Sequence, residues 1–263
     1  WVFGMTDIAV KLGMLLLFVV GVYYLFRTFK SFDDSKYQLV SWILILFFIL
    51  NPAFAVWAMK ARGGYLTAFV LCAILVFLFT KKSEHSSIEK ILVGIIPVVI
   101  YQAQPLFLAG LIPLILVYCI RNSSVKNWTY WSTGAFASIL IFLAIKWNIS
   151  NYWSPEILDF KNFEWADLSN LPKQILIHLS GWYTYELKLE PSNTSFYFAA
   201  FTLIILIFTP LFLLFKMIRN KKFDGIAFAL ILGMGVYFAL FPFLKRESYR
   251  YLLPVSVFGI LVL

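Results

Sequence analysis

The chain has 263 residues, of which 62% are hydrophobic, 19% are aromatic and only 13% are charged. Soluble domains average about 45–50% apolar and about 25% charged residues, so this composition excludes a water-soluble fold and predicts an all-α integral membrane protein. The formal net charge of +9 would suggest nucleic-acid binding in a soluble protein, but the basic residues here stand in short loops between apolar runs, where topology and anionic lipid head groups account for them.

Apolar run length predicts about nine membrane-spanning helices in one transmembrane domain over residues 1–263. We place them at 8–26, 39–50, 65–79, 91–101, 106–120, 130–145, 196–215, 225–244 and from 251 onward. A helix needs about 20 residues to cross the hydrocarbon, so the second, fourth and fifth need flanking residues or end in a cavity. Because the sequence begins at Trp1 without an initiator Met and stops inside an apolar run, we expect a piece of a longer polypeptide.

Alternation of these helices sorts the connections into two sets. One set is short and strongly basic, with Arg27, Lys30, Lys36, Lys81, Lys82, Lys90, Arg121, Lys126, Lys216, Arg219, Lys221 and Lys222. The positive-inside rule places this set in the cytoplasm, which makes segment 148–195 an extracytoplasmic loop. Within it, a short helix starting near Pro172, with Ile175, Leu176 and Leu179 on one face, is predicted to lie along the outer interface. This loop either covers the bundle or gates a substrate.

Two groups of cations stand at outer ends of helices, where the positive-inside rule disfavours them. The groups and their neighbouring tyrosines are Lys60, Arg62 and Tyr65, and Lys245, Arg246, Tyr249 and Arg250. One explanation is that these side chains extend to the phosphates of outer phospholipids. The other is a binding site for the phosphate or diphosphate of a lipid-linked donor, because Arg grips phosphate oxygens through two hydrogen bonds and Lys adds a point charge.

The stretches NPAFAVWAMKARGGYLTAFVLCAILVFLF and RESYRYLLPVSVFGILVL, together with GMTDIAVKLGMLLLFVVGVYYLFR, carry a family resemblance. They resemble the membrane part of GT-C fold glycosyltransferases, the superfamily of protein O-mannosyltransferases and lipid A aminoarabinose transferase. In that superfamily a pattern like A-R-P-Y ends a segment joining two helices, and a later motif reads like R-Y-x-L-P. Residues 61–65 here read Ala-Arg-Gly-Gly-Tyr, and residues 250–254 read Arg-Tyr-Leu-Leu-Pro.

The resemblance implies transfer of a sugar from a polyprenyl-phosphate carrier to a glycan, lipid or protein acceptor, at the extracytoplasmic face of the cell (inner) membrane or endoplasmic reticulum. The family's Asp or Glu that acts as base or metal ligand lies in its first outer loop, which would precede Trp1. The catalytic residue, and any divalent metal it holds, are therefore expected outside this chain. The substrate-binding residues implied here are Lys60, Arg62, Tyr65, Arg246, Tyr249 and Arg250.

Two other functions fit the same residues. A polysaccharide polymerase, flippase or lipid transporter would share the outer cations and the long outer loop, and an acidic pair in an outer loop before Trp1 would favour the transferase over these. A structural subunit of a membrane complex would instead direct the cations to a neighbouring protein. The sequence has no Walker A loop, no His/Cys metal spacing and no intramembrane Asp or Glu that would mark a proton relay, which disfavours an ion-coupled pump.

Overall fold

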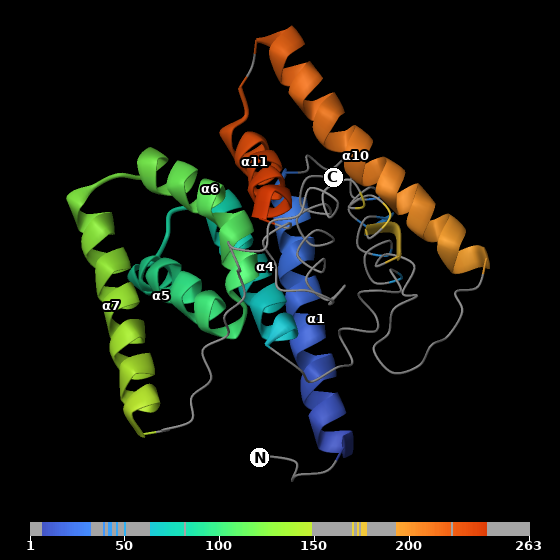
Figure 1. The fold of residues 1–263 in the computed structure, drawn as a ribbon. Coiled ribbons are helices and arrows are strands. Elements are labelled where there is room, and N and C mark those ends of the chain that lie inside the picture. Colours follow the sequence, from blue (N-terminus) through green and yellow to red (C-terminus); the bar gives the residue numbers. More distant parts are fainter. Residues whose placement is uncertain are drawn as a thin grey trace.

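The computed structural model describes residues 7–32, 64–81, 83–148, 193–221 and 223–240, together with 39, 42, 43, 46, 50, 170, 173 and 175–177. Regular structure within this described part is entirely α-helical, which confirms the all-α prediction (Figure 1). The helices are α1 (Asp7–Phe32), α4 (Tyr65–Thr80), α5 (Ser87–Ala103), α6 (Pro105–Arg121), α7 (Val125–Asn148), α10 (Asn193–Asn220) and α11 (Gly225–Leu240).

Three of these helices are long and apolar enough to cross a membrane. Their spanning segments are Val10–Ser31, Val125–Trp147 and Phe196–Asn220. α4, α6 and α11 are also apolar but shorter. These features support an integral membrane protein. Of the remaining predicted spans, the one from 251 onward lies outside the described residues, and so does most of 39–50.

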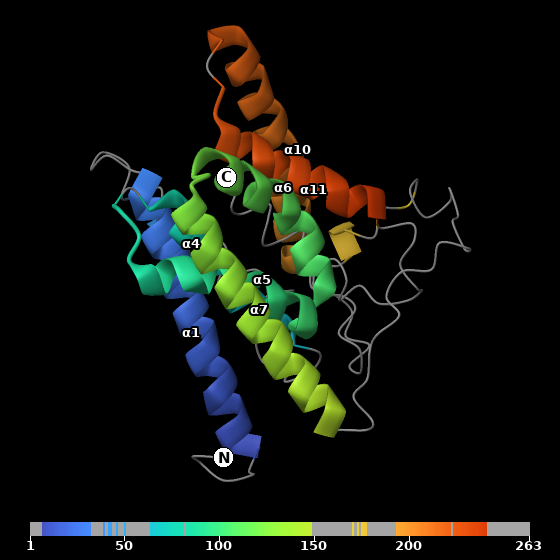
Figure 2. The same cartoon turned by 90° about the vertical axis from the view of Figure 1, so that its left-hand side faces the viewer.

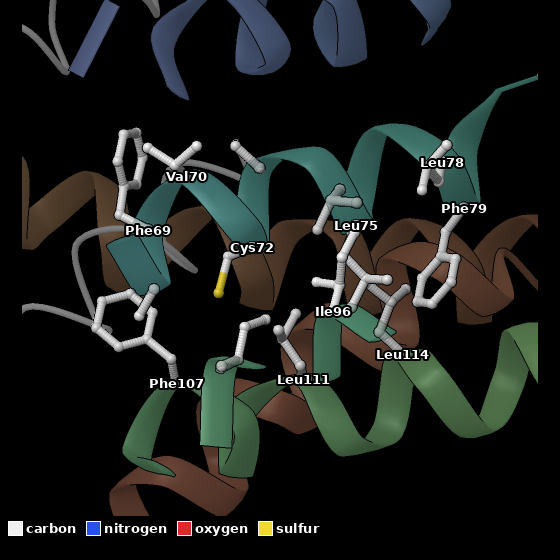
Figure 3. Close-up of a cluster of buried hydrophobic side chains, with 14 of the residues drawn as sticks. Phe69, Val70, Cys72, Leu75, Leu78, Phe79, Ile96, Phe107, Leu111 and Leu114 are labelled. Carbon is white, nitrogen blue, oxygen red and sulfur yellow. The ribbon is translucent and has the colours of Figure 1, made fainter. Parts of the chain in front are cut away.

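α4 forms the centre of the core. Residues all around it are buried, and Phe69, Cys72 and Leu75 are 0% exposed. Figure 3 shows these side chains opposite Phe107 and Leu111, which reach in from α6. A helix that is apolar on every face is expected to be surrounded by other helices, as this one is. Cys72 is fully buried among these residues and packs as a small hydrophobic side chain.

Glycines let two helix pairs approach until their backbones touch. A Cβ atom built on Gly94 of α5 would lie 2.0 Å from the carbonyl oxygen of Trp131 in α7. A Cβ on Gly233 of α11 would lie 2.0 Å from the carbonyl oxygen of Gly110 in α6. Small residues at such crossings are typical of membrane helices, where close van der Waals contact drives association.

Several helix ends that flank the predicted basic connections lie together, and we call this end of the bundle the basic end. Ser31 Oγ donates to Thr80 Oγ1 over 3.4 Å, which joins the ends of α1 and α4. Ser87 Oγ lies 3.3 Å from Tyr130 Oη, which joins the starts of α5 and α7. At the opposite end, which we call the distal end, Gly64 before α4 lies against Ala103 at the end of α5. These contacts agree with the directions predicted for α1, α4, α5 and α7.

Candidate lipid-binding groove

An apolar cavity of about 370 Å³ lies between α10 and α11, within the size range of about 300–1,000 Å³ that is usual for ligand sites. The α10 wall is made by Leu203, Leu206, Ile207, Pro210, Leu211 and Leu214, and the α11 wall by Ile231, Met234, Gly235 and Phe238, with Ile175 completing the lining. We call this cavity the α10–α11 groove. No lining residue carries a polar side chain, so the groove suits a hydrocarbon.

A proline in α10, which has no backbone N–H, and a glycine in α11, which has no side chain, shape the groove. Pro210 is inside α10, and because proline has no N–H, the carbonyl of Leu206 loses its usual helical hydrogen bond at the middle of the groove. Gly235 leaves open space on the α11 wall, since a Cβ atom built there meets nothing within 4 Å. Two residues earlier, Gly233 is packed tightly against α6. One glycine of α11 therefore fixes the helix, and the other opens the groove.

Ile175 contributes the remaining side of the groove from the predicted outer loop. Residues 173 and 175–177 are helical, which supports the predicted short helix, and Ile175 is only 5% exposed. Figures 1 and 2 show this segment at the level of the C-terminal, distal end of α11. Leu179 and the rest of that helix lie outside the described residues. Of the face predicted from the sequence, Ile175 is buried and Leu176 is half-buried.

Of the predicted substrate-binding residues, the structure describes Tyr65. It is the first residue of α4 and is 3% exposed, so its ring belongs to the distal end of the core. The other five, which are Lys60, Arg62, Arg246, Tyr249 and Arg250, lie outside the described residues, as does Lys245. Their contacts with a phosphate, and that of Tyr65, stay predictions. In sequence, Arg62 is three residues before the distal start of α4, and Arg246 is six residues after the distal end of α11.

Gly64 explains one departure from the family pattern. The resemblance would place proline directly before Tyr65, where this chain has glycine. Gly64 has a φ angle of +67°, which lies in the left-handed region, whereas proline is fixed near about −65°. A Cβ atom at this position would also lie 2.5 Å from the carbonyl oxygen of Ala103. Glycine is therefore required by the local backbone and by the approach of α5.

A polar and aromatic cluster at the basic end is the feature that our sequence reasoning missed. Glu89 accepts a 2.7 Å hydrogen bond from Lys81 Nζ and a 2.8 Å bond from the Ser86 backbone N–H. Together with Ser86 Oγ, which accepts from the Glu89 N–H, this is a capping box that starts α5. Lys81 and the Ser86 N–H hold the pKa of Glu89 below its ordinary value. The sequence signal was the run Ser86-Ser87-Ile88-Glu89.

Tyr118 connects this capping box to the core. Its ring stacks on Phe79 with 4.1 Å between centroids and also contacts the rings of Trp131 and His85. Burial lowers the pKa of His85, whose Nδ1 atom lies 3.8 Å from Glu89 Oε2. Within the described ranges, no three His, Cys, Asp or Glu side chains gather where they could hold a metal ion. The hydrogen bond between Lys81 and Glu89 joins α4 to α5, and the ring of Tyr118 joins α6 to α4 and α7.

Comparisons with known proteins return no relative. No protein-family model matches the chain, and no curated protein or solved structure matches it either. The groove is accordingly interpreted from its lining and its position.

Proposed function

We propose that this protein is an integral membrane glycosyltransferase, with about nine spans in a GT-C-like arrangement. It would take a sugar from a polyprenyl-phosphate carrier and pass it to an acceptor at the extracytoplasmic face. The observation that supports this proposal best is the α10–α11 groove, whose lining is wholly apolar. A donor that carries a long hydrocarbon tail needs such a surface beside the site where its head group reacts.

Binding energy is divided between the two ends of such a donor. Inside a bilayer the lipid tails are as apolar as the groove, so the tail gains only closer van der Waals contact on entering. The charged phosphate gains far more from fixed cations in a water-poor site. The groove would therefore orient the donor, while Arg62 and Arg250, assisted by Lys60 and Arg246, would hold its phosphate.

The reaction moves charge onto that phosphate. The bond between the anomeric carbon and the phosphate oxygen breaks, and the acceptor oxygen bonds to the anomeric carbon. The acceptor proton passes to a carboxylate base, and polyprenyl phosphate leaves. Cations that strengthen their hold as the phosphate oxygen becomes more negative lower the barrier. Tyr65 and Tyr249 would orient the sugar or the phosphate.

The test uses the full-length protein in membranes that contain the native acceptor, supplied with a labelled polyprenyl-phosphate sugar. We expect Arg62→Ala and Arg250→Ala each to reduce label transfer by about a hundredfold or more, as for other lost transition-state contacts. Arg219→Ala, which removes a cation at the basic end, is the matched control and should transfer normally. Immunoblotting establishes equal amounts of each variant in the membrane.

Two outcomes would contradict the proposal. Retained transfer in both variants would show that Arg62 and Arg250 do not take part in the reaction. Movement of the intact donor between leaflets, with the bond between sugar and phosphate unbroken, identifies a flippase or transporter, which would need a similar groove for the same tail.

A further inference from the structure

We infer that the starts of α5 and α7 form a binding site for the phosphate group of an anionic phospholipid at the basic end. Lys90 and Lys126 supply positive charge, and the hydroxyl groups of Ser87 and Tyr130 supply hydrogen bonds. This inference concerns the end of the bundle opposite the predicted donor site, and it does not depend on the proposed function.

Close packing of α5 against α7 brings these side chains together (Figure 1). Gly134 of α7 lies directly against the carbonyl oxygen of Ile91 in α5. One helical turn nearer the basic end, Ser87 Oγ lies 3.3 Å from Tyr130 Oη. Because the glycine contact involves backbone atoms, the spacing of the two hydroxyl groups is fixed by the helices themselves.

Two lysines flank this pair of hydroxyl groups. Lys90 Nζ lies 5.9 Å from the centre of the Tyr130 ring. Lys126 is exposed and comes one turn before Tyr130 on α7, so the two lie on the same face of that helix. One cation from each helix is therefore placed beside Tyr130, where both can approach the same anion.

Neither lysine is neutralised by a carboxylate within the described ranges. Glu89 follows Ser87 and precedes Lys90, but it accepts its hydrogen bonds from Lys81 and from the Ser86 N–H. Two neighbouring positive charges without a counterion create a local potential that attracts an anion.

The surroundings of the two lysines fit a phospholipid better than a phosphate ion in solution. The apolar stretch of α7 that is long enough to cross a membrane begins at Val125, so Lys126 and Tyr130 belong to its first two turns. Val125 and Ile88, which belong to the first turns of α7 and α5, are both strongly exposed. A lipid can cover such apolar side chains while its phosphate meets the lysines. Basic sites between membrane helices bind anionic head groups in this way.

Charge should decide which phospholipid binds. Phosphatidylglycerol carries one net negative charge, whereas phosphatidylcholine has the same phosphate and a cation that cancels its charge. Each lysine near a membrane surface should favour the anionic lipid by about fivefold. The hydroxyl group of Tyr130 contacts only the phosphate, so it should contribute equally to both lipids.

The experiment uses native mass spectrometry of the purified full-length protein in detergent. It measures the affinity of the first lipid bound, for phosphatidylglycerol and phosphatidylcholine with identical acyl chains. We expect the wild-type protein to bind phosphatidylglycerol about tenfold more tightly or better. Lys90→Gln and Lys126→Gln should each weaken its binding by about fivefold, and the double variant should bind both lipids alike. Tyr130→Phe should weaken both lipids by about three- to tenfold, because it keeps the ring and removes the hydroxyl group.

Lys146→Gln is the matched control. Lys146 is an exposed lysine in the last turn of the same helix, and its substitution should leave the preference for phosphatidylglycerol unchanged. An equal loss in this variant would show diffuse attraction to all surface lysines and would overturn the site.

Three other results would also overturn the inference. Equal affinity of the wild-type protein for the two lipids refutes selection by charge. Displacement of phosphatidylglycerol by an equal concentration of its head group without acyl chains, glycerophosphoglycerol, identifies a site for a soluble phosphate ester. Unchanged binding in the double variant refutes the role of the lysines. If circular dichroism shows that the double variant is misfolded, Lys126→Gln alone, at an exposed residue, must give its loss of about fivefold.

Discussion

The contact between α6 and α11 gives the most direct test of the packing. Gly233→Ala places a methyl group where the carbonyl oxygen of Gly110 lies 2.0 Å away. That oxygen is part of a helix backbone, so no side-chain rotation relieves the clash and the two helices must separate. Gly235→Ala is the matched control, since it is the same substitution two residues along the same helix and meets nothing within 4 Å.

The size of the difference follows from two effects. Both substitutions gain about 1 kcal/mol, because alanine favours the helix over glycine. Gly233→Ala alone suffers overpacking, which costs about 1–3 kcal/mol in tightly packed sites, and the fixed carbonyl places it at the upper end of that range. We therefore expect Gly235→Ala to be stabilised by up to about 1 kcal/mol and Gly233→Ala to lie about 3 kcal/mol below it.

Unfolding can be followed by circular dichroism while sodium dodecyl sulfate replaces a mild detergent around the purified protein. The Gly233→Ala transition should move to a lower sodium dodecyl sulfate fraction than wild type, and the Gly235→Ala transition should be equal or higher. Coincident transitions for the two variants would refute the backbone contact between α6 and α11.

Three further predictions concern the capping box, His85 and the core. Ser86→Ala removes the N-cap of α5 and should lower the free energy of unfolding by about 1 kcal/mol. Ser83→Ala, at an exposed residue, should change it by less than about 0.5 kcal/mol. Chemical unfolding of the two variants measures the difference. Burial lowers the pKa of His85 from 6.5, so the unfolded chain binds the proton more tightly. The free energy of unfolding therefore decreases as the pH drops below that value. His85→Gln should make this decrease smaller, as measured by thermal unfolding at several pH values. Phe107→Ala, fully buried, should cost about 3–5 kcal/mol, and Phe208→Ala, exposed on α10, far less by the same measurement.

Apolar run length predicted the membrane part of most helices well. The prediction of 65–79 for the third span agrees with α4 at Tyr65–Thr80, because Gly64 directly precedes the helix and 12 of its 16 residues are buried. α7 and α10 are longer than predicted, at Val125–Asn148 and Asn193–Asn220. Their polar ends stay helical beyond the hydrocarbon. Hydrophobicity thus marks where a helix crosses lipid and not where its hydrogen bonding ends.

The groove could not be predicted from the same pattern. Gly233 and Gly235 look alike in the sequence, and only the arrangement of α6, α10 and α11 shows that one is packed and the other faces open space. Pro210 did not indicate the groove either, since a proline in a membrane helix has many roles. The predicted cations are a different case. Five of the six predicted substrate-binding residues lie outside the described residues, so the phosphate site stays a prediction.

The connection between α5 and α6 has a consequence for the surrounding bilayer. Gln104 alone joins the two helices, is 5% exposed, and uses its backbone N–H and carbonyl in hydrogen bonds to Ile100 and Phe107. Each helix has 17 residues, or about 25 Å, which is shorter than the about 30 Å hydrocarbon core. With its polar backbone groups satisfied, such a turn is tolerated below the membrane surface. The bilayer beside this turn must then become thinner. This local thinning would bring lipid head groups closer to the interior of the bundle.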